Sequence, residues 1–175
     1  MILALFMACI PDDVADDSAT KESTTDSQSG GDDSSSTDDS EPAGDQDITG
    51  AWLSEGDNIS DLLAAGGFVK ITANFKSDGT YTTDATDSRG TTYNLAGTYT
   101  VDTSTLPGTI VAHQTTPTSV TAEGIWQVNG DTLLYEVAQT SPDKGFTPPT
   151  PQGGFGSTTG PNVEPGINVQ TYKRQ

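Results

Sequence analysis

Few side chains in this sequence have the types and the spacing that chemistry requires. His113 is the only histidine, so a Ser-His-Asp triad or a two-histidine metal site would lack its partners. Cys9 is the only cysteine, which excludes an internal disulfide and a cysteine-based zinc site. The sequence also lacks the motifs of a nucleophile elbow, a phosphate-binding loop and a zinc-protease helix. We therefore expect no catalytic activity, no metal and no cofactor.

Three aspartates are the remaining candidates for catalysis. A pair drawn from Asp84, Asp87 and Asp102 would have the groups that hydrolyse glycosidic bonds, but that chemistry depends on a carboxyl separation that sequence spacing does not define. Aspartate is also common in turns, because its side chain bonds nearby backbone amides. We interpret all three as turn and loop-edge residues. His113 lies in a Thr-rich stretch and is expected to be solvated.

The N-terminal residues MILALFMACI form the one sustained apolar run, in which Ala8 directly precedes Cys9. The run is shorter than the ~18 residues of a membrane-spanning helix, and it fits the end of a signal peptide with a small residue at the cut. It resembles the lipobox of bacterial lipoproteins, in which the cysteine is diacylated on sulfur and becomes the mature N-terminus. Phe6 and Met7 depart from the usual lipobox residues, and no basic residue precedes them.

The lipobox resemblance has consequences for location. It implies a signal-peptide remnant and lipobox over residues 1–9, and a membrane lipid as the partner of acylated Cys9. Two or more acyl chains hold a protein firmly on a membrane. The protein would then lie in the bacterial cell envelope, at the outer membrane or cell surface rather than in the cytoplasm. The alternative is a truncated ordinary signal peptide with Cys9 merely unpaired.

Residues 10–47 consist mainly of Asp, Ser and Thr, with almost nothing that could be buried. Such a segment cannot offset the entropy of ordering, so we expect a disordered acidic tether with an end-to-end distance of roughly 30–40 Å or more. Its paired aspartates lack the repeat and the rigid frame of a calcium site, which favours a solvated spacer. The net charge of −18 repels phosphate backbones, so no nucleic-acid partner is expected.

From Ile48 onward, β-branched and aromatic residues alternate with polar ones, the pattern of strands with one buried face. A short helix is expected at 60–65, with Ser60 as N-cap and Gly66 after its end. Residues 48–175 are long enough to fold alone as one domain. We predict an all-β fold, an eight-stranded antiparallel up-and-down barrel with one short helix, with a sandwich as the alternative. The expected strands are 48–54, 67–76, 80–86, 91–102, 108–114, 119–128, 132–139 and 166–173.

Two turns define the expected pairing. A three-residue loop at 77–79, with Gly79 left-handed, sets Phe75 opposite Tyr81 on the apolar face. A two-residue turn at Asn129-Gly130 would set Trp126 opposite Leu133.

The apolar faces of these strands carry large side chains. Two uses of the interior are left open, because eight-stranded barrels serve for either. The barrel binds a small apolar or amphipathic ligand or an envelope component, or its own side chains fill it and it serves as a structural or protein-interaction module. The sequence indicates no oligomeric state. The candidate ligand-binding residues are Tyr81, Tyr99, Trp126 and Tyr135, and the rest of the expected inward set is Val69, Ile71, Phe75, Leu95, Val101 and Leu133.

Gly50-Ala51-Trp52 on the first strand looks like the G-x-W signature of lipocalins and their calycin relatives. GTYTVDTSTLPGTI, GIWQVNGDTL and the final YKR are more specific, and they resemble lipocalin-like domains of uncharacterised bacterial lipoproteins. The resemblance covers about residues 48–175 and implies a calycin-like barrel with no known activity. The residues that carry it are Gly97, Tyr99, Asp102, Pro107, Gly124, Ile125, Trp126, Gly130, Asp131, Leu133 and Arg174.

The lipocalin resemblance also implies that Arg174 packs across Trp52 and closes one barrel end by a cation–π contact. Strict alternation from Val169 places Arg174 on the other face, so the contact would need a bulge, or Lys173 in its place.

The connection 141–166 is long for a compact domain and carries Phe146 and Phe155. We consider two interpretations. The segment is a lid whose phenylalanines plug an open barrel end, or it is a surface Ω-loop that uses them as anchors.

Overall fold

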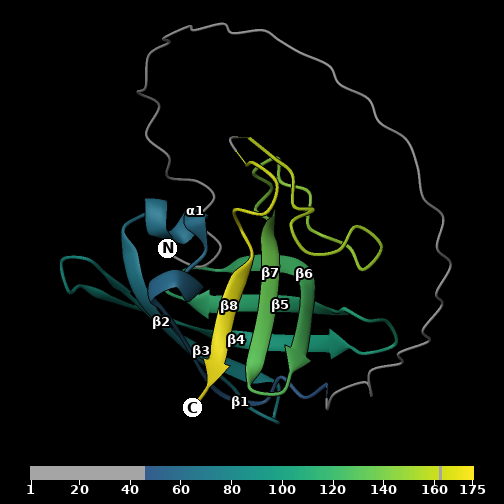
Figure 1. Ribbon diagram of the computed structural model, residues 1–175, viewed down its shortest axis with the longest axis horizontal. Helices are drawn as coiled ribbons and strands as arrows, with labels where there is room; N and C mark the ends of the chain where they lie inside the picture. The colour runs from purple at the N-terminus through teal and green to yellow at the C-terminus, as the bar shows by residue number, and fades with distance from the viewer. Residues whose placement is uncertain (1–45, 162) are drawn as a thin grey trace, which may run out of the picture.

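The computed structural model describes residues 46–161 and 163–175, which form a closed antiparallel β-barrel (Figure 1). The strands follow one another around the barrel in sequence order, and the last strand pairs with the first. The predicted all-β, eight-stranded up-and-down barrel with one short helix is therefore confirmed. In chain order the elements are β1 (Gly50–Glu55), the 3₁₀ turn η1 (Gly56–Asn58), α1 (Asp61–Ala65), β2 (Phe68–Phe75), β3 (Thr80–Asp87), β4 (Thr92–Asp102), β5 (Gly108–Thr116), β6 (Val120–Asn129), β7 (Thr132–Ser141) and β8 (Gln170–Arg174).

The helix α1 begins and ends where the sequence predicts. The Ser60 hydroxyl accepts a hydrogen bond from the Leu63 amide at 3.4 Å, and Gly66 follows the last turn. The helix buries Leu62 and Leu63, and the Leu62 amide donates to the Ile167 carbonyl at 2.9 Å, just before β8. Within the described ranges no helix is long and apolar enough to cross a membrane.

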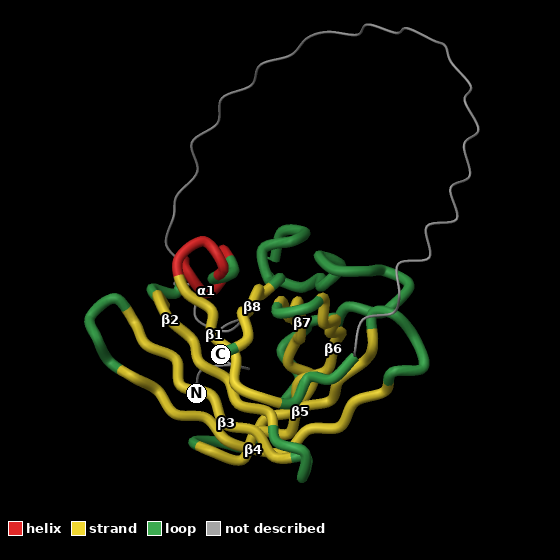
Figure 2. Tube along the Cα trace, turned by 60° about the horizontal axis from the view of Figure 1, so that its bottom comes forward, coloured by secondary structure: helices red, strands yellow, loops and turns green. Residues whose placement is uncertain are grey.

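The barrel has two different ends (Figure 2). At the tryptophan end, which holds Trp52 and the C-terminus, the strands are joined by the short connections 76–79, 103–107 and 130–131. The helix end carries α1 and the segment 142–169, which runs from β7 to β8 and is called the strap below.

One of the two predicted turns is confirmed. Phe75 pairs with Tyr81, the Lys76 amide bonds to the Thr80 carbonyl, and Gly79 has a left-handed φ of +80°. A shorter loop would move every side chain of one strand to the opposite face of the sheet.

The second turn prediction is wrong. Asn129 pairs with Thr132, so the turn residues are Gly130 and Asp131, and Trp126 lies opposite Tyr135 rather than Leu133. The predicted and observed registers differ by two residues, a shift that leaves each side chain on the same face. Alternation alone therefore does not distinguish them.

Most of the predicted interior residues are buried, with two exceptions that lie near strand ends. Val69 is 47% exposed, because the β2–β3 pairing shifts between Phe68 and Lys70 and places Phe68 in the core instead. Val101 is 39% exposed at the end of β4. The prediction that these two valines point into a packed interior is therefore wrong.

Aromatic side chains fill the centre of the barrel. Phe75 lies at the middle of this group, with its ring centroid 5.1 Å from Tyr99, 6.0 Å from Tyr81 and 6.0 Å from Tyr135. Tyr135 in turn meets Tyr172 edge-on at 6.3 Å. Offset and edge-to-face contacts of this kind stabilise a core beyond the area they bury.

The bulge in β2 predicts losses of stability of different size for two nearby apolar residues. Ile71 is fully buried in the core cluster, so Ile71→Ala should lower the free energy of unfolding by about 2–5 kcal/mol. Val69→Ala removes a largely exposed side chain and should cost less than about 1 kcal/mol. Urea unfolding of both variants measures the difference. Equal losses would show that β2 alternates without a bulge.

Candidate functional site

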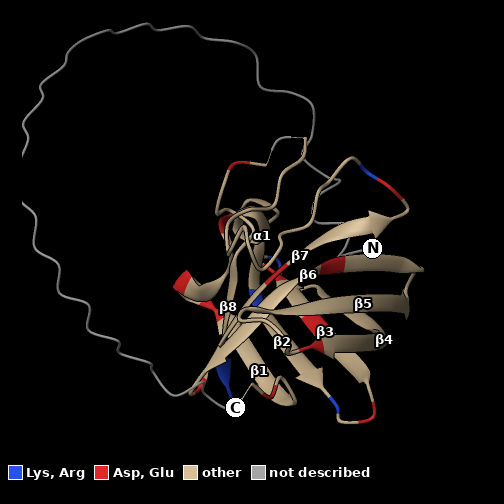
Figure 3. Cartoon of the chain, turned by 90° about the vertical axis from the view of Figure 1, so that its right-hand side faces the viewer, with Lys and Arg blue, Asp and Glu red and all other residues tan. Residues whose placement is uncertain are grey.

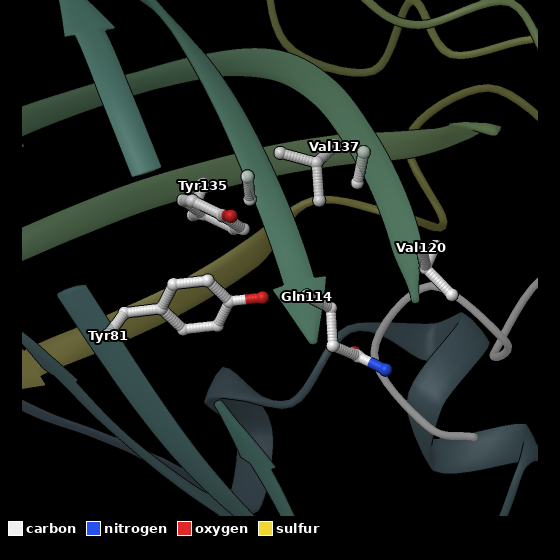
Figure 4. Close-up of a pocket in the computed structure, with 7 residues that line it drawn as sticks. Tyr81, Gln114, Val120, Tyr135 and Val137 are labelled. Atoms are coloured by element: carbon white, nitrogen blue, oxygen red, sulfur yellow. The ribbon is translucent and has the colours of Figure 1, made fainter. Parts of the chain in front are cut away.

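The structure does not bring the four candidate ligand-binding residues into one pocket. Tyr81 and Tyr135 line a small interior pocket toward the helix end (Figure 4). Tyr99 and Trp126 instead border a separate hollow at the tryptophan end, and both of their polar groups are already bonded. The Tyr99 hydroxyl donates to the Lys76 carbonyl at 2.8 Å, and the Trp126 indole donates to the Thr109 carbonyl at 3.1 Å.

The interior pocket is far smaller than a ligand site. Its volume is about 10 Å³, whereas pockets for small organic ligands measure roughly 300–1,000 Å³. The wider hollow at the tryptophan end, about 300 Å³, lies between the entering segment 46–49 and the β2–β3 connection. Ile48 from that segment is buried and forms part of the core cluster, so the entering chain itself covers this end of the core.

The buried tyrosines of the interior are held in the neutral form. Burial raises the pKa of Tyr81 to about 12. Burial also raises the pKa of Tyr135 well above its ordinary value, with smaller contributions from Tyr81 and Tyr172, and it raises the pKa of Tyr172. A phenolate in this apolar space would lose its hydration without gaining a counter-charge.

These pKa shifts predict a loss of stability at alkaline pH. The unfolded chain releases the tyrosine proton near pH 10, whereas folded Tyr81 keeps it to about pH 12. The stabilisation is therefore complete below about pH 10 and falls as the pH rises toward 12. Urea midpoints measured between pH 9 and 12, with tyrosinate absorbance, test this. Tyr81→Phe should show a shallower decline, and an unchanged midpoint across this window in the wild type would contradict the prediction.

The tryptophan end is closed by the Trp52–Arg174 contact that the lipocalin resemblance implies. The two residues pair directly across β1 and β8, and the guanidinium carbon lies 4.2 Å from the indole ring centroid. Arg174 also donates to the carbonyls of Thr49 at 2.9 Å and Asp47 at 3.1 Å. A glycine at position 50 suits this packing, because φ is +120° there and a Cβ would stand 3.0 Å from the Arg174 guanidinium.

The expected obstacle to that contact does not arise. Val169 lies outside β8, and the strand places Gln170 and Tyr172 on the interior face, with Arg174 in the same alternation. Neither a bulge nor Lys173 is needed, because the alternation starts one residue later than the sequence suggested.

The strap is fastened to the outer face of the β6–β7 hairpin by a buried carboxylate. Glu136 on β7 is 1% exposed and accepts hydrogen bonds from the Gly156 amide at 2.6 Å, the Thr158 amide at 3.1 Å and the Thr158 hydroxyl. Pairing places Glu136 beside Ile125, which is fully buried although it also points outward. The alternation of residues assigns this outer face of β6 and β7 to solvent, but the strap covers it.

The phenylalanines of the strap act as anchors within it. Phe146 is buried but lies outside the barrel core cluster, and it packs so closely on Gly160 that a Cβ there would stand 2.2 Å from its ring. Thr147 and Thr159 exchange backbone hydrogen bonds across the same turn. Phe155 is half-buried. This packing favours the surface-loop interpretation over a plug of the barrel end.

Glu136→Gln tests whether the carboxylate holds the strap. The change replaces one charged acceptor oxygen by an amide that faces backbone and hydroxyl donors, so we expect a loss of about 1.5–3 kcal/mol of unfolding free energy and faster proteolysis within 142–169. Glu123→Gln is the matched control on β6, because Glu123 is exposed and accepts a hydrogen bond from the Thr140 hydroxyl at 2.9 Å. It should change stability by less than about 0.5 kcal/mol. Equal effects would contradict a special role for Glu136.

Acidic residues lie on several strands and connections of the barrel (Figure 3). The remaining candidate side chains come from β3, β4 and β5. His113 is exposed, and its ring nitrogen Nδ1 shares a hydrogen bond with the Thr121 hydroxyl at 3.1 Å. Asp87 and Asp102 end their strands and accept hydrogen bonds from following amides, which lowers the pKa of both carboxyls, as expected for turn residues. Asp84 differs: it lies inside β3 and accepts from the Asn94 side chain on β4, so its assignment to a turn or loop edge is wrong. No group of acidic, histidine or cysteine side chains suited to a metal occurs among the described residues.

Cys9 and the predicted tether up to residue 45 lie outside the described residues. The last two residues assigned to that tether contact the barrel: Gln46 donates to the Val128 carbonyl at 3.0 Å, and the Asp47 carbonyl accepts from Arg174 on β8 at 3.1 Å.

No family model, curated protein or solved structure matches this chain. The closed eight-stranded antiparallel barrel is consistent with a lipocalin-like fold.

Proposed function

We propose that this protein is a membrane-anchored bacterial lipoprotein that presents a non-catalytic, lipocalin-like barrel at the cell envelope. The barrel is filled by its own side chains and serves as a structural or protein-interaction module. The observation that carries the proposal is the packed interior, in which the pocket beside Tyr81 and Tyr135 measures about 10 Å³.

The filled interior argues against the long apolar ligands that a hollow barrel of this size would hold. Phe75 contacts three tyrosine rings at 5.1–6.0 Å, and both tryptophans are fully buried. An apolar chain could enter only by displacing these side chains, at a cost comparable to disrupting the core. The runner-up function, binding of a small apolar ligand or envelope component, would use the open hollow of about 300 Å³ at the tryptophan end.

Anchoring is supported by the sequence at Cys9 and by where the chain enters the domain. Residues 46–49 reach the barrel at the tryptophan end, whereas α1 and the strap lie at the helix end (Figures 1 and 2). A tether that leaves from the tryptophan end leaves the helix end free to meet other envelope components. The membrane lipid joined to Cys9 would be the one lipid partner.

Detergent partitioning of the full-length product in a bacterial host tests the anchor. Wild-type protein should move to the detergent phase and incorporate labelled fatty acid, because two or more acyl chains bind membranes firmly. Cys9→Ser should move it to the aqueous phase without label. The same distribution for both proteins would refute acylation at Cys9.

Tryptophan fluorescence tests the filled interior separately from the anchor. Titration of the Cys9→Ser protein with oleate should leave the emission of Trp52 and Trp126 unchanged, because both indoles are fully buried and the interior pocket is too small for an acyl chain. A saturable change would favour the ligand-binding alternative. If Val101→Asp, placed at the rim of the larger hollow, abolished that change, the ligand would be located there.

A further inference from the structure

The interior pocket contains a buried polar group with unused bonding capacity. Gln114 on β5 lines the pocket and is 3% exposed. Its amide nitrogen donates to the Thr118 carbonyl at 3.1 Å, which identifies the remaining atom as the oxygen. That oxygen is fully buried and has no hydrogen-bond partner in the protein. An unbonded buried acceptor costs roughly 1–3 kcal/mol, so a native fold normally supplies it with a donor.

Another interior glutamine shows what full bonding looks like in this barrel. The Gln170 side-chain oxygen accepts from the Ser60 amide at 2.9 Å, and its nitrogen donates to the Asn58 carbonyl and the Ser54 hydroxyl. Gln170 therefore satisfies both ends of its amide within the protein. In Gln114 only the amide nitrogen has a partner within the protein. Its oxygen has none, and Gln114 borders the interior pocket.

The pocket has the size of one small polar group. Its volume of about 10 Å³ corresponds to roughly one water-sized probe, the minimum that holds a water molecule. Small side chains make this space, because Ala112 and Ala122 stand where most interior positions carry larger groups. A site for a water-sized group also needs more than one polar partner.

Two tyrosines supply those partners. Tyr81 and Tyr135 line the same pocket, and Figure 4 shows the Tyr81 hydroxyl directed toward Gln114. The raised pKa of each tyrosine keeps its hydroxyl protonated, so it can both donate and accept. No charged side chain lines the pocket, which excludes an ion as its occupant because a buried ion would lack a counter-charge.

We propose that the pocket bordered by Gln114, Tyr81 and Tyr135 is a binding site for one neutral hydroxyl group of the size of water. The hydroxyl donates to the Gln114 side-chain oxygen and exchanges hydrogen bonds with the tyrosines. Water and the hydroxyl of a small alcohol share this chemistry. The site goes beyond the proposed function, and it is compatible with a barrel that excludes acyl chains.

The test uses nuclear Overhauser contacts in isotope-labelled Cys9→Ser protein, which otherwise keeps the full chain. In water, the methyl groups of Ala112 and Ala122 should show contacts to a long-lived water molecule. Methanol is then added to test whether an alcohol binds in the same pocket. Binding would give contacts from the methanol methyl group and loss of the water contacts. Persistence of the water contacts would assign the site to water. Either result supports the proposal.

Gln114→Leu keeps the approximate volume and removes the acceptor, so both sets of contacts should be lost. Gln127→Leu is the matched control, because Gln127 lies half-buried on β6 outside the pocket and bonds the Asn129 side chain. It should leave the contacts unchanged. If Gln114→Leu does not fold, Ala112→Val fills the pocket instead and should also abolish them. Absence of any long-lived water or methanol contact in the wild type, or contacts unaltered in Gln114→Leu, would overturn the proposal.

Discussion

The structure depends on one constraint: an eight-stranded barrel closes around a space that must be filled. The interior of such a barrel is only wide enough for side chains or one small ligand. Here Phe75 occupies the middle and contacts tyrosines from β3, β4 and β7, so residues from several strands meet on one ring. Closure between β1 and β8 is then sealed by the Arg174 guanidinium over Trp52. This packing supports the structural or protein-interaction role proposed above, because a filled space leaves the outer surface and the loops as the parts available to partners.

Much of this fold could be predicted from the sequence because its signals are local. Alternation of residues such as Leu95 and Tyr99 identifies a strand, and Ser60 followed by Gly66 identifies the helix. The Trp52–Arg174 contact was predicted from the lipocalin resemblance and not from residue spacing, because alternation counted from Val169 places Arg174 on the opposite face. Features that depend on the pairing of two strands were predicted less well. The bulge that exposes Val69 and the two-residue register shift at Gly130 both preserve a plausible local pattern.

The features that bear most on the candidate sites could not be predicted, for a related reason. Glu136 occupies an outward position on β7, which in a simple barrel faces water, and its burial depends on the distant residues Gly156 and Thr158. The interior pocket likewise results from how Ala112 and Ala122 meet Tyr81 and Tyr135 across four strands. Neither arrangement produces a recognisable sequence pattern at any single residue. Both appear only when segments far apart in the chain are placed side by side.

The hydrogen bonds of Glu136 affect the chain entropy of joining the last strand, β8, to the barrel. β8 is short, pairs with β1 at two positions, and follows β7 only after the whole of residues 142–169. Bringing the ends of a long flexible loop together costs chain entropy that grows with the logarithm of its length. Because Glu136 holds Gly156 and Thr158 beside β7, the unattached connection to β8 is reduced to the stretch after Thr158. The carboxylate on the outside of the barrel thus shortens the effective connection to the strand that completes its wall.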